Sequence, residues 1–297
     1  MRAFAFEQPE TLQDAIAILA RAPEARLLAG GTDLIIRLRD GSVATNLVVD
    51  VKRIRELDAS ISEAAGSLVI GARTVMTDIA ADPRIRREYT ALAEGAAVVG
   101  SVQIRNRATL AGNICNASPA ADTVPALLVF GATVVVSGPG GERRIPIDEV
   151  FVRSGVTTLR PGEILTRIEL PRPGGAWGSV QLRRTRRRGH DLASVTLACA
   201  VLPSGETRLA FGSVGPRPLL AADASGALAD PRTSDAERSR ILDAMLAPAS
   251  PSPRSMRASP EYRLAMLRVL ALRGIEIARE RLGSGGPGMS RAHPGGG

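Results

Sequence analysis

The stretch Leu28-Ala29-Gly30-Gly31-Thr32-Asp33-Leu34 lies near the start of the chain, and Thr109-Leu110-Ala111-Gly112-Asn113 is a second stretch of the same kind. Each places glycine beside a threonine hydroxyl at the end of an apolar run, so bare backbone N–H groups can approach an anion without obstruction. Two such loops could hold a diphosphate from both sides. Neither matches G-x-G-x-x-G or G-x-x-x-x-G-K-[ST], which argues against Rossmann and P-loop nucleotide sites.

The length of 297 residues is enough for two or three domains with sizeable cores. The longest apolar segment, 124–136, is interrupted by Pro125 and Gly131 and is too short to span a membrane. The first residues lack a basic region followed by a long apolar stretch, so no secretory signal is expected. We therefore expect a cytoplasmic protein.

Metal-binding side chains are scarce, since the chain has two cysteines and two histidines. This is too few for a four-ligand zinc site from closely spaced residues or for an iron–sulfur cluster. Metal redox chemistry would therefore belong to a partner, and Cys115 is expected to be a small buried residue rather than a redox group.

The net charge of +8 comes almost entirely from arginine. An arginine run at 183–188 suggests a phosphate-binding patch or, more simply, a solvated or partner-facing strand end. With aromatic residues at 3%, few rings are available to stack on bases, so nucleic-acid binding is not expected.

Strands and helices alternate through the first hundred residues, which predicts α/β layering. Thr11-Leu12-Gln13-Asp14 has the form of a capping box and predicts a helix over 11–21. Apolar spacing then predicts strands at 26–29, 47–51 and 68–72, and helices at 33–39 and 85–99.

Further along, the pattern predicts a short helix at 126–130 and a β-hairpin whose strands, 132–136 and 143–147, flank the turn Gly138-Pro139-Gly140-Gly141. The proline and glycine cluster at 171–175 indicates a domain joint. Beyond it we expect strands at 179–184, 192–202 and 207–214 and helices at 236–246 and 260–282, the last with Ser259 as its N-cap. The predicted domains are 1–174 (subdomains 1–56 and 57–174) and 175–283, followed by a disordered tail at 284–297.

Several ordered motifs carry a family resemblance. The second glycine stretch continues to Asp122 as Asn113-Ile114-Cys115-Asn116-Ala117-Ser118-Pro119-Ala120-Ala121-Asp122, and Gln103-Ile104-Arg105-Asn106, Leu209-Ala210-Phe211-Gly212 and Arg257-Ala258-Ser259 accompany it. Over residues 4–282 the chain resembles the FAD-binding subunit of the xanthine dehydrogenase and aerobic carbon monoxide dehydrogenase family of molybdenum hydroxylases.

The resemblance implies an α+β protein: a two-subdomain FAD-binding fold of the vanillyl-alcohol-oxidase (PCMH-type) group, then a C-terminal domain of a three-stranded sheet plus helices. It implies an oxidoreductase subunit that binds FAD, with molybdopterin in a large partner subunit and iron–sulfur clusters in a small one. Electrons would pass from the clusters through FAD to NAD or another acceptor, a conversion between one-electron and two-electron steps that belongs to the flavin itself.

The resemblance also implies which residues contact FAD. They are Leu28, Ala29, Gly30, Gly31, Thr32, Asp33, Leu34, Val99, Thr109, Ala111, Gly112, Asn113, Asp122, Leu165 and Arg183. Gly112 is expected to offer its N–H directly to a phosphate oxygen, which leaves no room for a branched side chain. Asp122 is expected to hold a ribose hydroxyl on the adenosine side, the alternative being a turn-capping role.

Four positions depart from the family or stay open. Ala111 stands where glycine is common, Val99 where some relatives place an aromatic ring, and Arg183 where relatives place a lysine, which unlike arginine can give up a proton. Asp191 either lies beside the flavin or pairs with the neighbouring arginines. His190 next to it is expected to be a bystander.

Two alternatives are a flavin subunit of a hydroxybenzoyl-CoA-reductase-like complex and a nucleotide-binding module without turnover. Relatives of the first kind carry a cysteine-rich insertion, whereas 116–127 contains no cysteine. The substrate that the complex oxidises would be selected in another subunit.

Overall fold

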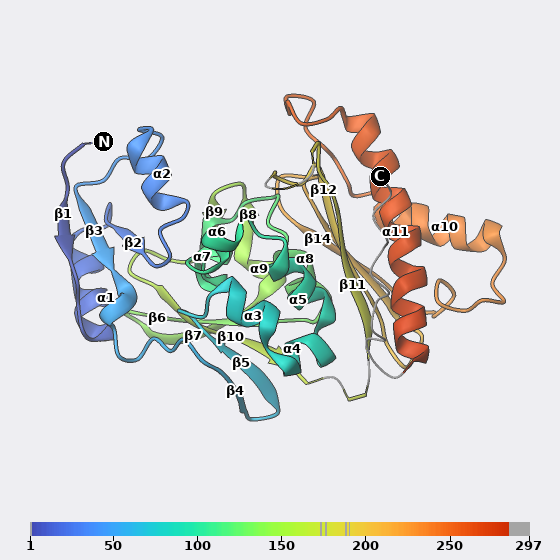
Figure 1. Cartoon of the computed structure of the whole chain (residues 1–297), viewed down its shortest axis with the longest axis horizontal. Helices are drawn as coiled ribbons and strands as arrows, with labels where there is room; N and C mark the ends of the chain where they lie inside the picture. Colours follow the sequence, from blue (N-terminus) through green and yellow to red (C-terminus); the bar gives the residue numbers. More distant parts are fainter. Residues whose placement is uncertain (1, 173, 176, 188, 190, 285–297) are drawn as a thin grey trace.

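The computed structural model describes residues 2–172, 174–175, 177–187, 189 and 191–284. Three blocks follow one another along the long axis of the molecule (Figure 1): a small unit at the N-terminus, a central unit of sheet and helices, and a C-terminal unit with the longest helix. Within these residues, no helix combines the length and the apolar character needed to cross a membrane. The predicted disordered tail lies outside the described residues from 285 onward.

The N-terminal unit is a parallel three-stranded sheet in the order β1-β3-β2. Its elements are β1 (Ala5–Glu7), α1 (Leu12–Arg21), β2 (Arg26–Leu28), α2 (Leu34–Arg39), β3 (Leu47–Asp50) and the 3₁₀ turn η1 (Val51–Arg53). The Thr11 side chain accepts a hydrogen bond from the Asp14 N–H, which confirms the predicted start of α1. Central strand β3 is buried along its whole length, as expected for a strand covered on both faces.

The central unit is built on a five-stranded antiparallel sheet in the order β4-β5-β10-β6-β7. The strands are β4 (Ile61–Ala64), β5 (Ser67–Gly71), β6 (Thr133–Gly138), β7 (Gly141–Pro146) and β10 (Ile164–Pro171), with the small pair β8 (Phe151–Arg153) and β9 (Val156–Thr157) beside them. The helices are α3 (Met76–Ala81), α4 (Pro83–Glu88), α5 (Thr90–Ala97), α6 (Val102–Arg105), α7 (Leu110–Asn116), α8 (Val124–Val129) and α9 (Ile147–Val150). The predicted hairpin is confirmed, since β6 pairs with β7 across Gly138 and Gly141.

The single helix predicted at 85–99 is wrong, because the backbone leaves the helical conformation at Tyr89 and divides the segment into α4 and α5. The apolar spacing runs through the break without interruption, since Ile85, Tyr89, Leu92 and Ala96 are all buried. Periodicity alone therefore could not reveal the break.

The C-terminal unit holds four antiparallel strands rather than the predicted three. They are β11 (Gly178–Arg184), β12 (Val195–Val201), β13 (Thr207–Gly212) and β14 (Leu219–Asp223), followed by α10 (Asp235–Leu246) and α11 (Pro260–Gly283). The added edge strand β14 is short and follows the segment Gly215-Pro216-Arg217-Pro218. These glycine and proline residues are typical of a loop, so the sequence pattern did not indicate a strand here. The N-cap of α11 is Ser259, as predicted.

Both faces of this C-terminal sheet are covered. On β12, Leu197 and Cys199 belong to the core shared with α10 and α11, whereas Ala198 and Ala200 belong to the core of the central unit. The alternation follows from the two-residue repeat of a strand. Because the side chains toward the central unit are small, its helices α5 and α8 approach the sheet closely.

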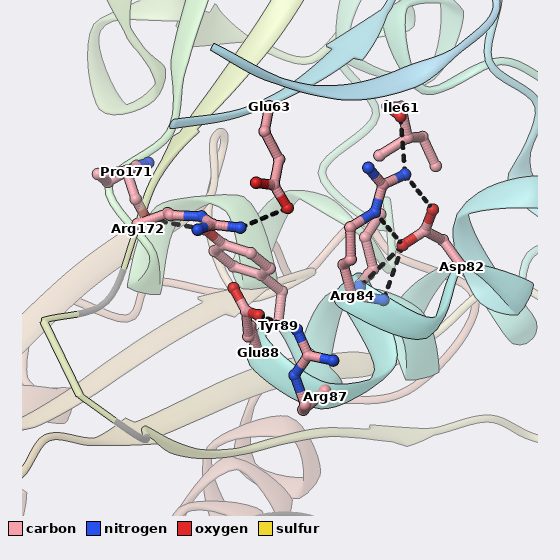
Figure 2. Close-up of polar contacts among 10 residues, drawn as sticks. Ile61, Glu63, Asp82, Arg84, Arg87, Glu88, Tyr89, Pro171 and Arg172 are labelled. Carbon is pink, nitrogen blue, oxygen red and sulfur yellow. Dashed lines mark hydrogen bonds and ion pairs between the residues drawn. The ribbon is translucent and has the colours of Figure 1, made fainter. Parts of the chain in front are cut away.

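A buried aromatic cluster marks the joint between the two larger units. The Tyr89 hydroxyl donates to the Pro171 carbonyl at 3.0 Å, and burial raises the pKa of Tyr89 to about 12. Its ring meets Phe130 edge-on, and Phe130 stacks on Trp177. Around Tyr89, Arg172 pairs with Glu63 of β4 (Figure 2). Pro171 and Arg172, at the start of the predicted domain joint 171–175, are thus held to the central unit.

We expect Gly178→Ala to destabilise the C-terminal unit. A Cβ atom at Gly178 would lie 1.7 Å from the backbone oxygen of Ala278 in α11, so the helix must move. Overpacking of this kind costs about 1–3 kcal/mol or more of unfolding free energy. Denaturant unfolding would measure it, with Gly174→Ala, where a Cβ meets no atom within 4 Å, as the matched control. Equal stability of the two variants would contradict the expected close packing.

Candidate functional site

A cavity of about 350 Å³ lies between the N-terminal and central units. Its wall contains most of the residues that the resemblance implied: Ala29, Gly30, Gly31, Thr32, Asp33, Leu34, Val99, Thr109, Ala111, Gly112, Asn113 and Leu165. Small-molecule pockets measure about 300–1,000 Å³, so this cavity lies at the lower end of that range.

Backbone N–H groups in the first glycine loop are free to bind a ligand. From Gly30 to Leu34, none of the five donates a hydrogen bond to any residue that the structure describes. These residues connect β2 to α2 and line the cavity. Consecutive free donors on a concave surface favour an anion. Ala111, on the opposite wall, also has an N–H without a partner in the described chain.

The first glycine loop touches the backbone of the two residues directly before the second loop. A Cβ atom at Gly30 would lie 2.0 Å from the Arg107 carbonyl oxygen, so only glycine permits this approach. Gly31 has a φ of +76°, a conformation that glycine adopts without strain. The second loop is held in turn by hydrogen bonds from the Leu110 N–H to the Thr74 carbonyl and from the Met76 N–H to the Ala108 carbonyl.

The Gly112 N–H, which was expected to bind a phosphate oxygen directly, has a hydrogen-bond partner within the chain. It donates to the Thr109 hydroxyl oxygen at 3.0 Å, as part of the N-cap of α7. The threonine hydroxyl thus fixes the start of α7, and the free donor on this wall belongs to Ala111 instead.

Further residues of the wall were not predicted. They are Arg26, Arg37, Val43, Val51, Leu57, Ala72, Ile104, Ala108, Cys115, Asn116, Gly155 and Ile164. Arg37 could have been found, because it stands four residues after Asp33 and so falls on the same side of α2. It donates from Nη1 to Asn116 Oδ1 at 3.5 Å, across the cavity from α2 to α7. The others come from strands and loops that only the tertiary fold brings together.

The prediction of a buried Cys115 is wrong. Its side chain is exposed and lines the cavity. It stands one turn after the buried Ala111, at the edge of the buried side of α7, where the helix borders the cavity. Cys199 is the buried cysteine, and both thiols are free.

Three implied residues lie outside the cavity wall: Leu28, Asp122 and Arg183. Arg183 of β11 donates to Asp122 Oδ2 at 2.8 Å, and their side chains are 19% and 8% exposed. Burial raises the pKa of Asp122, while the charge of Arg183 acts in the opposite direction. Oδ1 of Asp122 is buried and forms no hydrogen bond of normal geometry with the residues that the structure describes, while the nearby Thr196 side chain acts with Arg183 to lower the pKa of this carboxyl. This pair joins the central unit to the C-terminal sheet and leaves one acceptor unsatisfied.

Two further arginines of the run contact other side chains of the C-terminal unit. Arg184 donates to the Tyr262 hydroxyl at 2.9 Å, and Arg186 pairs with Asp191 at 3.4 Å. Asp191 is therefore a strand-end partner of an arginine in this structure. Arg188 and His190 lie outside the described residues. No group of three or more His, Cys, Asp or Glu side chains suited to a metal ion occurs in the part of the chain that the structure describes.

Comparison with known proteins decides the family. Residues 2–173 match the family model described as the FAD-binding domain in molybdopterin dehydrogenase. The chain belongs to this family. Residues 181–278 match the CO dehydrogenase flavoprotein C-terminal domain. The predicted fold class and FAD as the cofactor are thereby confirmed, and the free N–H groups and the glycine contact fit a diphosphate-containing ligand.

Relatives match over nearly their full length. The xanthine dehydrogenase FAD-binding subunit of Escherichia coli O157:H7 is 32% identical, and the match covers 92% of this chain and 95% of that protein. The carbon monoxide dehydrogenase medium chain of Hydrogenophaga pseudoflava is 28% identical, with 94% and 98% covered.

Solved structures of family members superpose closely. Carbon monoxide dehydrogenase from Hydrogenophaga pseudoflava gives a TM-score of 0.87 at 29% identity, covering 95% of this chain and 99% of that one. Quinoline 2-oxidoreductase from Pseudomonas putida 86 gives a TM-score of 0.81 at 27% identity, with 94% and 98% covered. The chain is thus similar to subunits of dehydrogenases that act on different substrates.

Gly30→Ala should separate the two glycine loops, because its Cβ atom cannot share space with the Arg107 carbonyl. An overpacking cost of about 1–3 kcal/mol at the site corresponds to a loss of FAD affinity of about fivefold to 150-fold. Flavin fluorescence titration would measure it, with Gly140→Ala, whose Cβ meets no atom within 4 Å, as the control. Wild-type affinity in Gly30→Ala would show that the cofactor does not need this contact.

Proposed function

We propose that this chain is the FAD-binding electron-transfer subunit of a molybdenum hydroxylase complex, and that it passes electrons from iron–sulfur clusters of a partner through FAD to NAD or another acceptor. The observation that carries the proposal is the row of free N–H groups from Gly30 to Leu34, which faces the second glycine loop across one cavity. When bound, FAD supplies the exchange between one-electron and two-electron transfer.

The two loops provide a place for the diphosphate. We assign one phosphate to the N–H groups of Gly30 to Leu34 and the other to the Ala111 N–H. A hydrogen bond to a charged group contributes about 1.5–3 kcal/mol, so a few of these donors account for tight retention. Arg26 and Arg37 on the same wall oppose one carboxylate, Asp33, and leave the cavity with an excess of positive charge.

Asp122 is proposed to accept a hydrogen bond from a ribose hydroxyl of FAD. Its buried Oδ1 has no hydrogen-bond partner among the described residues, and a ligand hydroxyl would supply the missing donor. Arg183 holds the other carboxylate oxygen and favours the ionised, accepting form. Because Arg183 is engaged with Asp122, it contributes a fixed positive charge and no proton.

Val99 and Leu165 complete the proposed site as apolar wall residues. Leu165 is a buried residue of β10, so a core role and a cofactor contact are compatible. With valine at 99, an apolar contact takes the place of aromatic stacking on the cofactor.

Partner subunits follow from the chemistry. The described part of the chain offers no metal cluster site, and the relatives are named as subunits or medium chains. We infer a small subunit with iron–sulfur clusters and a large subunit with molybdopterin. The substrate that they oxidise, and the cytoplasmic location, stay predictions.

A flavin subunit of the hydroxybenzoyl-CoA-reductase type is less favoured, because 116–127 lacks the cysteines of the extra cluster. A nucleotide-binding module without turnover differs in one measurable respect, since its bound flavin would not be reduced by NADH or by a reduced iron–sulfur partner.

The full chain is expected to bind FAD and not FMN, because two facing phosphate loops suit a diphosphate and FMN has a single phosphate. Acid release of the flavin followed by chromatography would identify it. Recovery of FMN alone, or of no flavin after saturation with FAD, would contradict the proposal. Anaerobic titration of the FAD-loaded chain with NADH then separates an NAD-linked subunit from one that uses another acceptor.

Asp122→Ala should weaken FAD binding. Loss of one hydrogen bond between the carboxylate and a ribose hydroxyl costs about 1.5–3 kcal/mol, which is roughly ten- to 150-fold in affinity. Fluorescence titration would measure it, with the exposed Asp78→Ala of α3 as the control. An unchanged affinity would remove Asp122 from the cofactor site.

A further inference from the structure

Arg263 is a buried cation without a carboxylate partner. It lies in the first turn of α11 and is 4% exposed. Its Nη1 donates to the Ser213 carbonyl at 2.6 Å and its Nη2 to the Ser255 hydroxyl, while Nε has no hydrogen-bond partner among the described residues. None of the described acidic residues forms an ion pair with it, and burial lowers its pKa. An unpaired buried charge is costly. The hydrogen bonds to Ser213 and Ser255 therefore offset part of the cost of burying this guanidinium.

Ser213 directly follows β13, and its N–H, carbonyl and hydroxyl groups all form hydrogen bonds. Its carbonyl accepts from Arg263, its hydroxyl donates to the Ala193 carbonyl at 2.9 Å, and its N–H donates to the Pro119 carbonyl at 2.7 Å. Its φ of +63° is a conformation that non-glycine residues rarely adopt. Such a conformation persists only where the surroundings fix it, and Arg263 is the charged group that does so here.

Pro119 belongs to the segment 117–122, which connects α7 to α8 and ends at Asp122. The segment is held at its start by the Gly155 N–H, which donates to the Ala117 carbonyl at 3.0 Å. In its middle it is pressed against the end of β13, since a Cβ atom at Gly212 would lie 2.6 Å from the Pro119 oxygen. Arg183 holds it at its end. Two of these three restraints come from the C-terminal unit.

We propose that Arg263 is a positioning residue that acts through Ser213 and Pro119 to hold the segment 117–122, and with it the Asp122 carboxylate, at the FAD site. The inference rests on the proposed role of Asp122 in binding FAD. It assigns the C-terminal unit a part in cofactor affinity through a residue that does not touch the cofactor. Charge-assisted hydrogen bonds are stronger than neutral ones, which explains an arginine at this place.

A purely structural role makes a different prediction. If Arg263 served only to fasten the loop that contains Ser255, its removal would lower stability without changing FAD affinity. The matched control is Arg268→Met, because Arg268 is on the same helix and its ion pair with Asp243 of α10 is remote from Ser213.

The first measurement needs no cofactor. Hydrogen exchange of the full chain reports the protection of the segment 117–122 in wild type, Arg263→Met, Arg263→Lys and Arg268→Met. We expect faster exchange of this segment in Arg263→Met, partial recovery in Arg263→Lys, which keeps a charged donor, and no change in Arg268→Met. Unchanged protection in Arg263→Met would overturn the inference even if FAD binds normally.

The second measurement is a double-mutant cycle of FAD affinity with Asp122→Ala. We expect Arg263→Met to weaken binding about three- to tenfold in the wild-type background, and to have almost no effect once Asp122 is alanine. An equal loss in both backgrounds would overturn the inference, because Arg263 would then act independently of Asp122. If Arg263→Met does not fold, Arg263→Lys takes its place in the cycle, with a smaller loss expected and the same two outcomes. Failure of the wild-type chain to bind FAD would instead refute the proposed function.

Discussion

The contact between Gly30 and the Arg107 carbonyl is the constraint on which the site depends. Two segments from different units approach so closely that one extra carbon atom would lie 2.0 Å from an oxygen. The approach turns two separate loops into opposite walls of one cavity. It also explains why the free N–H groups of one loop and the Ala111 N–H of the other can serve a single ligand.

Close approach also shapes the contact between the C-terminal sheet and the central unit. Alanines on one side of β12 let the helices of the central unit approach, and larger residues on the other side pack against α11. The Asp122–Arg183 pair and the Ser213–Pro119 hydrogen bond cross this joint. A sheet covered on both faces therefore transmits the position of α11 to a segment of the central unit.

The sequence correctly predicted structural features that depend on residues close together in the chain. The Thr11 cap, the β6–β7 hairpin and the Ser259 cap of α11 depend on neighbours in sequence, and all three were predicted correctly. At the helix break, Tyr89 contacts Pro171 and Phe130, which are distant in sequence, and the spacing of buried residues shows neither these contacts nor the break.

The same distinction applies to the site. The glycine loops could be recognised from the sequence because their backbone conformations require glycine at particular positions. Twelve of the fifteen implied residues line the cavity. The pairing of Asp122 with Arg183, the exposure of Cys115 and the use of the Gly112 N–H by Thr109 depend on how elements pack. The spacing of residue types along the sequence does not predict these contacts.

The position of β10 has a consequence for how the protein is made. β10 is the middle strand of the central sheet, between β5 and β6, yet it is the last of the five strands in sequence. During synthesis on the ribosome, β5 and β6 leave the exit tunnel with unpaired edges that β10 alone can cover. Open edges recruit other chains. The nascent chain thus passes through a stage vulnerable to aggregation that ends only when Pro171 has emerged and the sheet can close around its centre.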